Sequence, residues 1–480
     1  MSPFQNLAEH ANEHHQMSQD GLMTDEMLWT TKPSAANFGK GQAWFSDIGA
    51  MGYSDGVSWT VEKILPRQNV LSRCPVGAVQ VAAGYGGYTT HIEAELAGSA
   101  IAVRIGIPNL TSGTPTIDGS FGFEATLGAI DSSQSKGGTV STWNALTFGG
   151  AASGTHTATV SAAEPTWVWS DFITCRPLPR TDGEAGSIIH IRLIQGTAAG
   201  DATWFNGLWV ASATSEAVVS HKYRCYRSTA AADYATTAQS SFAANSGLAT
   251  SGAVPCIIQY VSLEQGHTLL TVGDSITTGA QASGLGYAAS GYGWSAKARD
   301  LLSTSTVPVE VCNLGWPGQT MAQASARYLD IAAEVKNCLL FHMNYSPNNS
   351  SSPMVISDIT TMRQTLAPSL AIASANGHRL IYQTGVPANA PTASGGLGGI
   401  AAKAFNAGDS NRVTYNSQLL DANELCIDVS TALSGLAVVS GTAVGQIEYN
   451  SSYTTDGLHP NNAGYDVWGN LVYNYLNGLI

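Results

Sequence analysis

The chain has 480 residues, of which 44% are apolar and only 11% are charged. This length predicts two or three domains, and the apolar fraction is large enough to build their cores. The formal charge of -13 argues against a nucleic-acid-binding protein, because no basic stripe is present to neutralise phosphates. A surface rich in Gly, Ser, Thr and Ala with few charges is typical of β-rich extracellular proteins.

The N-terminal stretch MSPFQNLAEHANEHHQMSQDG has neither the basic n-region nor the apolar h-region of a secretory signal. No apolar run is long enough to cross a bilayer, so we expect no membrane insertion. Three expectations for localisation stay open: a virion protein released by lysis, an extracellular protein whose signal has been removed, and a cytoplasmic protein. We interpret the histidine cluster of this stretch as a solvated segment rather than a metal site; it comprises His10, His14 and His15.

The cysteines are widely spaced, odd in number and without a C-x-x-C pair, which argues against a disulfide framework and a zinc site. Several stand in apolar, strand-like runs such as VEVCNL and NCLLF, so we expect buried and unreactive thiols. The sequence therefore predicts no metal and no cofactor. The seven cysteines are Cys74, Cys175, Cys225, Cys256, Cys312, Cys338 and Cys426.

Residues 1–60 form the first predicted part, which is polar at its start and ends on GQAWFSDIGAMGYSDGVSWT. Aromatic, Asp and Gly residues alternate at short spacing there, which predicts a small hairpin with its turn at Asp55-Gly56. The Ser-Asp-Gly-x-x-Trp ending resembles short modules of bacteriophage tail fibres and spikes. This resemblance implies that the chain is part of a tail spike or fibre.

Residues 61–262 form the second predicted part, a β-rich accessory domain. Short β-branched or aromatic runs, such as SAIAVRIGI and SIIHIRLI, alternate with turn residues, so we expect an antiparallel sandwich or jelly roll. Its role stays open between carbohydrate binding, a spacer and trimer packing, and no coiled-coil heptad supports a homo-oligomer. Its tryptophans are expected in the core more often than as sugar-binding platforms; they include Trp167, Trp169, Trp204 and Trp209.

Residues 263–480 form the third predicted part, in which apolar strands alternate with helical stretches. The strands are expected at TLLTVGDS, VPVEVCNLG, NCLLFHMN, RLIYQTGV and CIDV, and the last helix is expected after Pro460. This alternation predicts an α/β domain with a parallel sheet and helices on both of its faces. Such folds bind ligands at the carboxyl ends of their strands, where Gly273-Asp274-Ser275 closes the first strand.

A serine hydroxyl needs a base, a group that orients the base, and donors for the oxyanion before it can attack a carbonyl. Near the end of the chain, Asp456 and His459 stand in the loop YTTDGLHPNNAGY. A turn at Asp456-Gly457 brings the carboxylate back to the imidazole and leaves Nε2 for the Ser275 proton. We interpret Asp274 as structural, since its carboxylate can hold the turn by hydrogen bonds.

Ser275 in Gly-Asp-Ser-Ile, Gly318, an Asn after the third strand and the pair Asp456-x-x-His459 resemble, in order, the four blocks of the SGNH, or GDSL-type, hydrolases. The resemblance covers residues 263–480 only. It implies a flavodoxin-like three-layer fold and membership among esterases, lipases and carbohydrate deacetylases that need no metal. It also implies that Ser275 is the nucleophile, His459 the base and Asp456 the group that orients this base.

The resemblance further implies an oxyanion hole made of the backbone N–H groups of Ser275 and Gly318 and of one Asn side chain. The usual Gly-x-Asn-Asp of the family is Ser-Pro-Asn-Asn here, at residues 346–349. We assign Asn348, because it keeps the third place of that motif, and Asn344 is the alternative. The Ser and the second Asn depart from the family pattern and change the loop that carries the amide.

The sequence therefore predicts a serine esterase that works through an acyl-enzyme. The β-rich second part, the polar loop at residues 281–293 and the tail-like start favour the O-acetyl groups of a polysaccharide as its substrate. Trp316, beside Gly318, is a candidate for stacking on a sugar ring, with loop packing as the alternative. Two other functions stay open: a glycan-binding tail protein with a degenerate hydrolase domain, and a general short-chain esterase or lipase.

Overall fold

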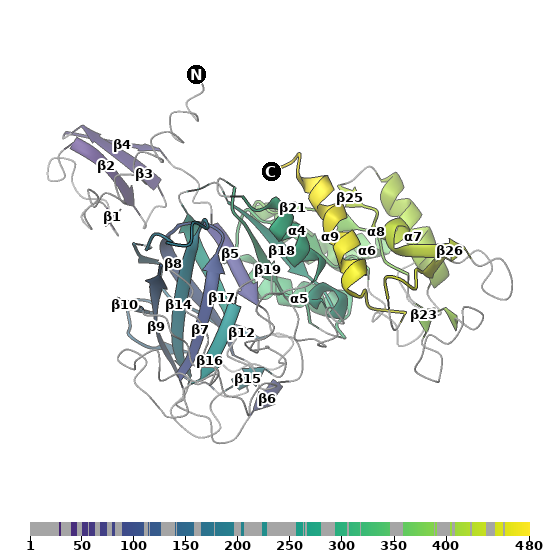
Figure 1. Cartoon of the computed structure of the whole chain (residues 1–480), viewed down its shortest axis with the longest axis horizontal. Helices are drawn as coiled ribbons and strands as arrows, with labels where there is room; N and C mark the ends of the chain where they lie inside the picture. Colours follow the sequence, from purple (N-terminus) through teal and green to yellow (C-terminus); the bar gives the residue numbers. More distant parts are fainter. Residues whose placement is uncertain are drawn as a thin grey trace.

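A computed structural model gives the structure of the chain. It describes residues 28–29, 40–45, 50–55, 57–62, 68–73, 79–81, 89–109, 114, 116–125, 140, 142–157, 165–176, 178–195, 203–205, 223–227, 256–262, 264, 266–279, 293–304, 307–316, 318–345, 359–387, 389–390, 404–405, 409–422, 425–437, 447–454 and 457–480. Figure 1 shows the strands of the middle of the chain gathered in one part and the helices of its C-terminal half in the other.

A small sheet lies at the start of the chain. Its order is β1-β2-β3-β4, and β3 and β4 pair antiparallel. Of the predicted turn, Asp55 ends β3 and Gly56 lies outside the described residues. The strands are β1 (Leu28–Trp29), β2 (Lys40–Phe45), β3 (Ala50–Asp55) and β4 (Trp59–Glu62).

A six-stranded antiparallel sheet follows, with the order β10-β9-β14-β7-β16 and with β11 paired to β9. On β14, Ile189, Ile191 and Leu193 face the core, whereas His190 and Arg192 alternate with them and face the other side. The strands are β7 (Thr89–Leu96), β9 (Thr116–Glu124), β10 (Trp143–Ala145), β11 (Gly154–Thr155), β14 (Ser187–Gln195) and β16 (Tyr223–Arg227).

A nine-stranded sheet forms the centre of the molecule, with the order β12-β8-β17-β5-β19-β18-β20-β21 and with β13 paired to β8. Its strands β12, β13, β8, β17 and β5 pair antiparallel, whereas β5, β19, β18, β20 and β21 pair parallel. The strands are β5 (Gln68–Arg73), β8 (Ala100–Asn109), β12 (Thr166–Trp169), β13 (Ile173–Thr174), β17 (Ile257–Ser262), β18 (His267–Val272), β19 (Val309–Asn313), β20 (Leu339–His342) and β21 (Arg379–Leu380).

The antiparallel end of this sheet packs on the six-stranded sheet. Ile105 and Ile258 of the one sheet share an apolar core with Phe121 and Ile191 of the other. Residues 89–262 thus contain the two packed sheets of a sandwich, which is the arrangement that their short alternating runs predict. The further two-stranded pair here joins β6 (Val79–Val81) to β15 (Thr203–Phe205).

The parallel end carries helices on both faces and forms three layers. The helices α5 and α6 share one apolar core with the sheet, and α4, α8 and α9 share another. The predicted alternation of strands and helices is present. The helices are α3 (Ser275–Thr278), α4 (Trp294–Leu302), α5 (Met321–Ala332), α6 (Ile359–Ala375), α7 (Asp409–Asp421), α8 (Val429–Leu433) and α9 (Asn462–Leu476).

One residue after β21, strand β22 continues in the same direction and pairs parallel with β25. The parallel strands therefore end together at one edge of the molecule, where ligands of α/β folds bind. The remaining strands form short pairs; they are β22 (Tyr382–Gln383), β25 (Cys426–Ile427), β23 (Asn389–Ala390), β24 (Ala404–Phe405), β26 (Ser434–Ala437) and β27 (Ile447–Tyr449).

The central sheet runs through the position at which the sequence divides the second part from the third. Strand β5 pairs antiparallel with β17 and also pairs parallel with β19, where Cys312 lies opposite Ser72 and Asn313 opposite Arg73. The division into domains at residue 262 stays a prediction. In the structure, strands from both sides of residue 262 are hydrogen-bonded to one another in one sheet.

A buried polar cluster lies beside this junction. Glu310 of β19 is fully buried, and its carboxylate accepts hydrogen bonds from the Tyr260 hydroxyl at 2.7 Å and from the Ala97 N–H. Arg299 of α4 lies 4.0 Å from the same carboxylate. Burial raises the pKa of Glu310, against the opposing effect of Arg299. Strands from both halves of the chain therefore meet around one carboxyl group.

No described helix is long and apolar enough to cross a membrane. Among the described cysteine side chains, those of Cys175, Cys256, Cys312 and Cys338 are buried thiols and that of Cys426 is a partly exposed thiol. Burial raises the pKa of the Cys175 and Cys338 thiols, which keeps them protonated and unreactive.

Replacing Glu310 by Gln is expected to alter how stability depends on pH. The pKa of Glu310 is higher in the folded chain than the ordinary carboxyl value of 4.5. The protonated carboxyl therefore contributes its full stability below pH 4.5, and this contribution is lost as the pH rises through the folded-state pKa. Gln cannot ionise, so the melting temperature of Glu310→Gln relative to the native chain should rise between about pH 4 and about pH 7. Thermal melts across this range test it, with the exposed Glu184→Gln as the control, and parallel curves would contradict it.

Candidate active site

The turn after β18 presents Ser275 at the carboxyl edge of the sheet. A Cβ at Gly273 would clash with the Thr277 hydroxyl, so the turn requires glycine there. Asp274 caps the short helix α3, and its carboxylate accepts a hydrogen bond from the Ile276 N–H at 3.0 Å. This is the structural role expected for Asp274. Ser275 is then the first residue of α3 and is 7% exposed.

The loop before α9 presents His459. Gly457 has φ +79°, which favours glycine, and its N–H donates to the Thr454 hydroxyl at 2.9 Å. The same hydroxyl donates to the His459 carbonyl at 2.8 Å. Asn461 then caps α9 by accepting from the Gly464 N–H. The loop is thereby closed on itself before the helix begins.

The structure brings these two loops together. Ser275 Oγ lies 2.8 Å from His459 Nε2, although the residues are 184 positions apart. The Tyr465 hydroxyl of α9 donates to the Ile276 carbonyl of α3 at 3.1 Å. This bond fixes α9, which follows the His459 loop, against α3, which begins with Ser275. A hydroxyl and an imidazole at this distance have the geometry that serine hydrolysis requires of its nucleophile and base.

The contact between α4 and α9 also helps to hold the His459 loop beside Ser275. Trp294 and Trp468 stack with ring centroids 5.5 Å apart and nearly parallel planes. Both rings belong to the apolar core that also contains Ile276 and Tyr465. The position of the loop that carries His459 therefore depends on a packed aromatic core.

The loop after β19 is tied to the serine turn. The Asn313 side-chain amide donates to the Thr277 carbonyl and its oxygen accepts from the Gly315 N–H, each at 2.8 Å. The Trp316 N–H donates to the Gly273 carbonyl at 2.8 Å. These bonds hold the segment that leads to Gly318 beside Ser275.

Gly318 itself has φ +76°, and a Cβ there would meet no atom within 4 Å. Its backbone conformation, not a lack of space, therefore favours glycine. A residue other than glycine rarely adopts this φ, so it would rarely point its backbone N–H in the same direction. The assignment of this N–H to an oxyanion hole stays a prediction.

Asn344, the alternative amide, has a different task. Its side-chain N–H groups donate to the Gln383 carbonyl at 2.9 Å and to the Tyr415 hydroxyl at 2.7 Å, and the residue is 3% exposed. Both donors are thus engaged with the neighbouring strand and with α7. This favours Asn348 over Asn344 as the oxyanion amide, and Asn348 lies outside the described residues.

The predicted orienting carboxylate, Asp456, also lies outside the described residues, so its contact with His459 stays a prediction. Two other histidines near strand ends are unsuited to act as the base. Burial lowers the pKa of His342 and of His378 to about 4. A pKa this low makes both imidazoles weak proton acceptors, and the hydrogen bond of Ser275 Oγ is made to His459.

The contacts of Trp316 are packing contacts. The Arg327 guanidinium lies over its ring, 4.4 Å from the centroid, and the ring packs against the core of the β sandwich. These contacts agree with the loop-packing alternative and occupy one face of the ring. Stacking of Trp316 on a sugar stays a prediction.

A pocket lies beside the serine turn at the carboxyl ends of β18, β20 and β22. Its walls include the polar side chains of Asp274, Gln383 and Thr384 and the apolar side chains of Met343 and Leu458. Asp274 precedes Ser275 and Leu458 precedes His459, so the pocket adjoins both. A substrate group that enters it meets polar and apolar atoms together.

Sequence reasoning missed the residues that hold the site in place. Asn313, Thr454 and Tyr465 make the bonds described above, but each is an ordinary residue for its element. An Asn at the end of a predicted strand is the one signal that could have pointed to Asn313. The partners of Thr454 and Tyr465 became evident only once the loops were placed in space.

No family model matches the chain, and no curated protein matches it. A GDSL-like lipase from Bacteroides thetaiotaomicron is 18% identical over 44% of this chain and 89% of its own, with a TM-score of 0.30. A psychrotrophic esterase from Pseudoalteromonas is 14% identical over 44% and 98%, with a TM-score of 0.31. A Bacillus subtilis protein is 11% identical over 86% and 88%, with a TM-score of 0.32. Likenesses with TM-scores this low carry no argument about the chain.

Removing the Asn344 amide is expected to destabilise the fold. Asn344→Ala leaves the buried Tyr415 hydroxyl and the part-buried Gln383 carbonyl without their side-chain donor, and should lower the free energy of unfolding by roughly 2 kcal/mol. Urea unfolding measures this. The matched control is Asn470→Ala, because Asn470 is exposed on α9 and donates only within its own helix, to the Asp466 carbonyl. An equal effect of both substitutions would contradict the structural role of Asn344.

Proposed function

We propose that the chain is a serine ester hydrolase of the SGNH type. The observation that carries this proposal is the 2.8 Å contact between Ser275 Oγ and His459 Nε2 at the carboxyl edge of a parallel sheet. A serine and a histidine that are far apart in sequence meet at the edge where α/β folds bind their ligands. The sequence motifs around both residues agree with this function.

In the proposed mechanism, His459 Nε2 accepts the hydroxyl proton while Ser275 Oγ attacks the ester carbonyl. The imidazolium then gives this proton to the alcohol oxygen, the ester bond breaks, and the acyl group stays on Ser275. Water next loses a proton to His459 and attacks the acyl carbon. The serine oxygen regains the proton and the carboxylic acid leaves.

The other predicted residues have supporting roles in this proposal. Asp456 orients the imidazole and stabilises its charged form. The N–H groups of Ser275 and Gly318 and the Asn348 amide stabilise the oxyanion of the tetrahedral intermediate. The bonds that tie the β19 loop to the serine turn support this arrangement, because they keep Gly318 near the nucleophile.

We further propose that the substrate is an O-acetylated polysaccharide. The support is the β-rich part joined to the hydrolase part and the polar loop predicted at residues 281–293. An extracellular or virion-associated setting agrees with such a substrate and with the weakly charged composition.

Ser275→Ala is expected to abolish esterase activity. Loss of the nucleophile should reduce the turnover of p-nitrophenyl acetate by roughly 10³- to 10⁶-fold. Ser295→Ala is the matched control: Ser295 is buried on α4, and its hydroxyl has no hydrogen-bond partner in the described part of the chain. Equal activity of the native chain and Ser275→Ala would refute the Ser275 esterase, and equal inactivity would refute it and favour a glycan-binding protein.

Acetate release from a panel of acetylated polysaccharides tests the substrate class. The native chain should release acetate and Ser275→Ala should not, and chemically deacetylated polysaccharides serve as the blank. With p-nitrophenyl esters from acetate to palmitate, turnover should fall as the acyl chain lengthens. A preference for long chains would refute the deacetylase and leave a general lipase.

A further inference from the structure

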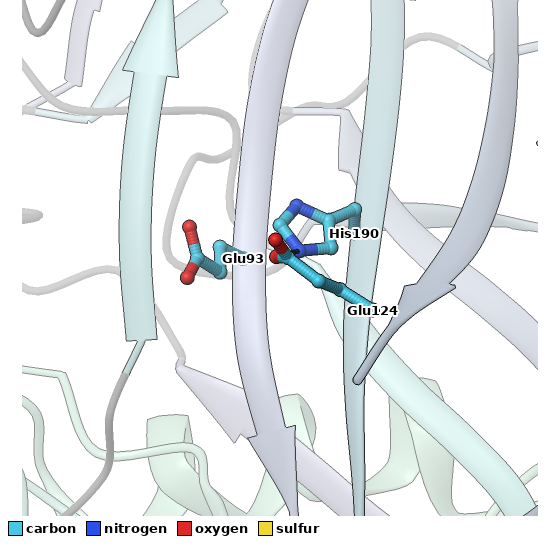
Figure 2. Close-up of side chains that lie close together, drawn as sticks. All are labelled: Glu93, Glu124 and His190. Carbon is cyan, nitrogen blue, oxygen red and sulfur yellow. Dashed lines mark hydrogen bonds and ion pairs between the residues drawn. The ribbon is translucent and has the colours of Figure 1, made fainter. Parts of the chain in front are cut away.

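A second cluster of chemically active side chains lies away from Ser275, in the six-stranded sheet (Figure 2). It consists of Glu93 on β7, Glu124 on β9 and His190 on β14. One donor atom from each of the three lies within 4.8 Å of the other two. The residues are 0%, 6% and 0% exposed, in the same order. An imidazole and two carboxylates thus meet in the interior.

The register of the sheet places the three side chains on one face. Strand β14 lies between β9 and β7, and His190 stands directly opposite Glu93. Glu124 stands opposite Ile188, two residues from His190 along β14. Side chains two positions apart share a face, so all three project to the side opposite the sandwich core. Three adjacent strands each contribute one donor.

The charges of the cluster require compensation, because buried carboxylates close to one another repel. His190 Nε2 lies 2.7 Å from Glu124 Oε2, which supplies one favourable contact. Arg180, on the same side of the sheet, forms ion pairs with Glu95 at 2.9 Å and with Asp182 at 2.6 Å. This arginine therefore neutralises a neighbouring pair of carboxylates.

A further arginine, Arg192, belongs to this face. The Arg192 guanidinium lies over the ring of Trp143, 3.9 Å from its centroid. On the far side of β7, strand β16 pairs with it, so the cluster lies within the sheet and not at its edge. Ser120 of β9 lies one row from His190; it is 2% exposed, and its hydroxyl has no hydrogen-bond partner in the described part of the chain. A further oxygen donor is thus buried on the same face.

We propose that Glu93, Glu124 and His190 bind one divalent transition-metal ion. An imidazole nitrogen with carboxylate oxygens is a ligand set of Zn²⁺, which binds such atoms at about 2.0–2.2 Å. Two ligand atoms of one ion are then at most roughly 4 Å apart, whereas the donor atoms of the cluster lie within 4.8 Å of one another. Small rotations of the glutamate side chains would bring all three atoms to binding distance. The ion cross-links three neighbouring strands and offsets the charge of both carboxylates.

A metal that binds the folded chain more tightly than the unfolded chain raises its melting temperature. The full chain, stripped with a chelator, is titrated with ZnCl₂ by calorimetry, and its melting temperature is measured with and without the ion. We expect one tightly bound ion per chain and a higher melting temperature. Glu124→Gln and His190→Gln should each weaken binding at least about 10- to 100-fold.

Two controls separate this site from other metal-binding groups. Glu95→Gln changes a carboxylate on the same strand and face that pairs with Arg180, so it should keep the ion. A variant with His10→Gln, His14→Gln and His15→Gln removes the N-terminal histidines, which can bind Zn²⁺ weakly on their own. It should also keep the tight site.

The proposal is overturned if the native chain binds no Zn²⁺ tightly, or if the triple histidine variant loses the ion while His190→Gln retains it. The cluster would then be a structural one, held by the contact between His190 and Glu124 without a metal. If the Glu124→Gln and His190→Gln variants do not fold, X-ray absorption spectroscopy of Zn²⁺ bound to the triple histidine variant identifies the ligand atoms instead. One imidazole with carboxylate oxygens supports the site, whereas sulfur or several imidazoles contradicts it.

Discussion

The hydrogen bond between Ser275 Oγ and His459 Nε2 is the interaction on which the proposed chemistry depends. It requires the first strand and the last helix of the parallel part to meet at one edge. The bond from Tyr465 to the Ile276 carbonyl and the stacked pair Trp294 and Trp468 keep them together. The reactive groups are thus held by packing and by hydrogen bonds that take no part in the reaction.

The same requirement applies to the loop that carries the proposed oxyanion donor Gly318. Asn313 ends β19, and its amide bonds both to the serine turn and to the loop that leads to Gly318. Trp316, on this loop, packs against the sandwich core. A residue next to the proposed oxyanion hole therefore contacts the β-rich half of the chain. The geometry of the site depends on both halves.

Much of the parallel part could be predicted from sequence, because its information is local. The periodicity around TLLTVGDS and GWSAKARDLLS is enough to expect β18 and α4. Partners that are distant along the chain could not be predicted in this way. The pairing of β5 with β19, the engagement of the Asn344 amide and the meeting of Glu93 with His190 all depend on register in three dimensions. No local pattern reports such a register.

The junction at β5 has a consequence for how the chain can be divided. In a fragment that begins at residue 263, β19 would become an edge strand, because its neighbour β5 would be absent. Its unpaired N–H and C=O groups would form a template for strand addition by other molecules. The buried Glu310 carboxyl would also lose Tyr260 and be exposed on that edge. Such a fragment would be prone to aggregate, even though it contains every residue of the proposed catalytic machinery.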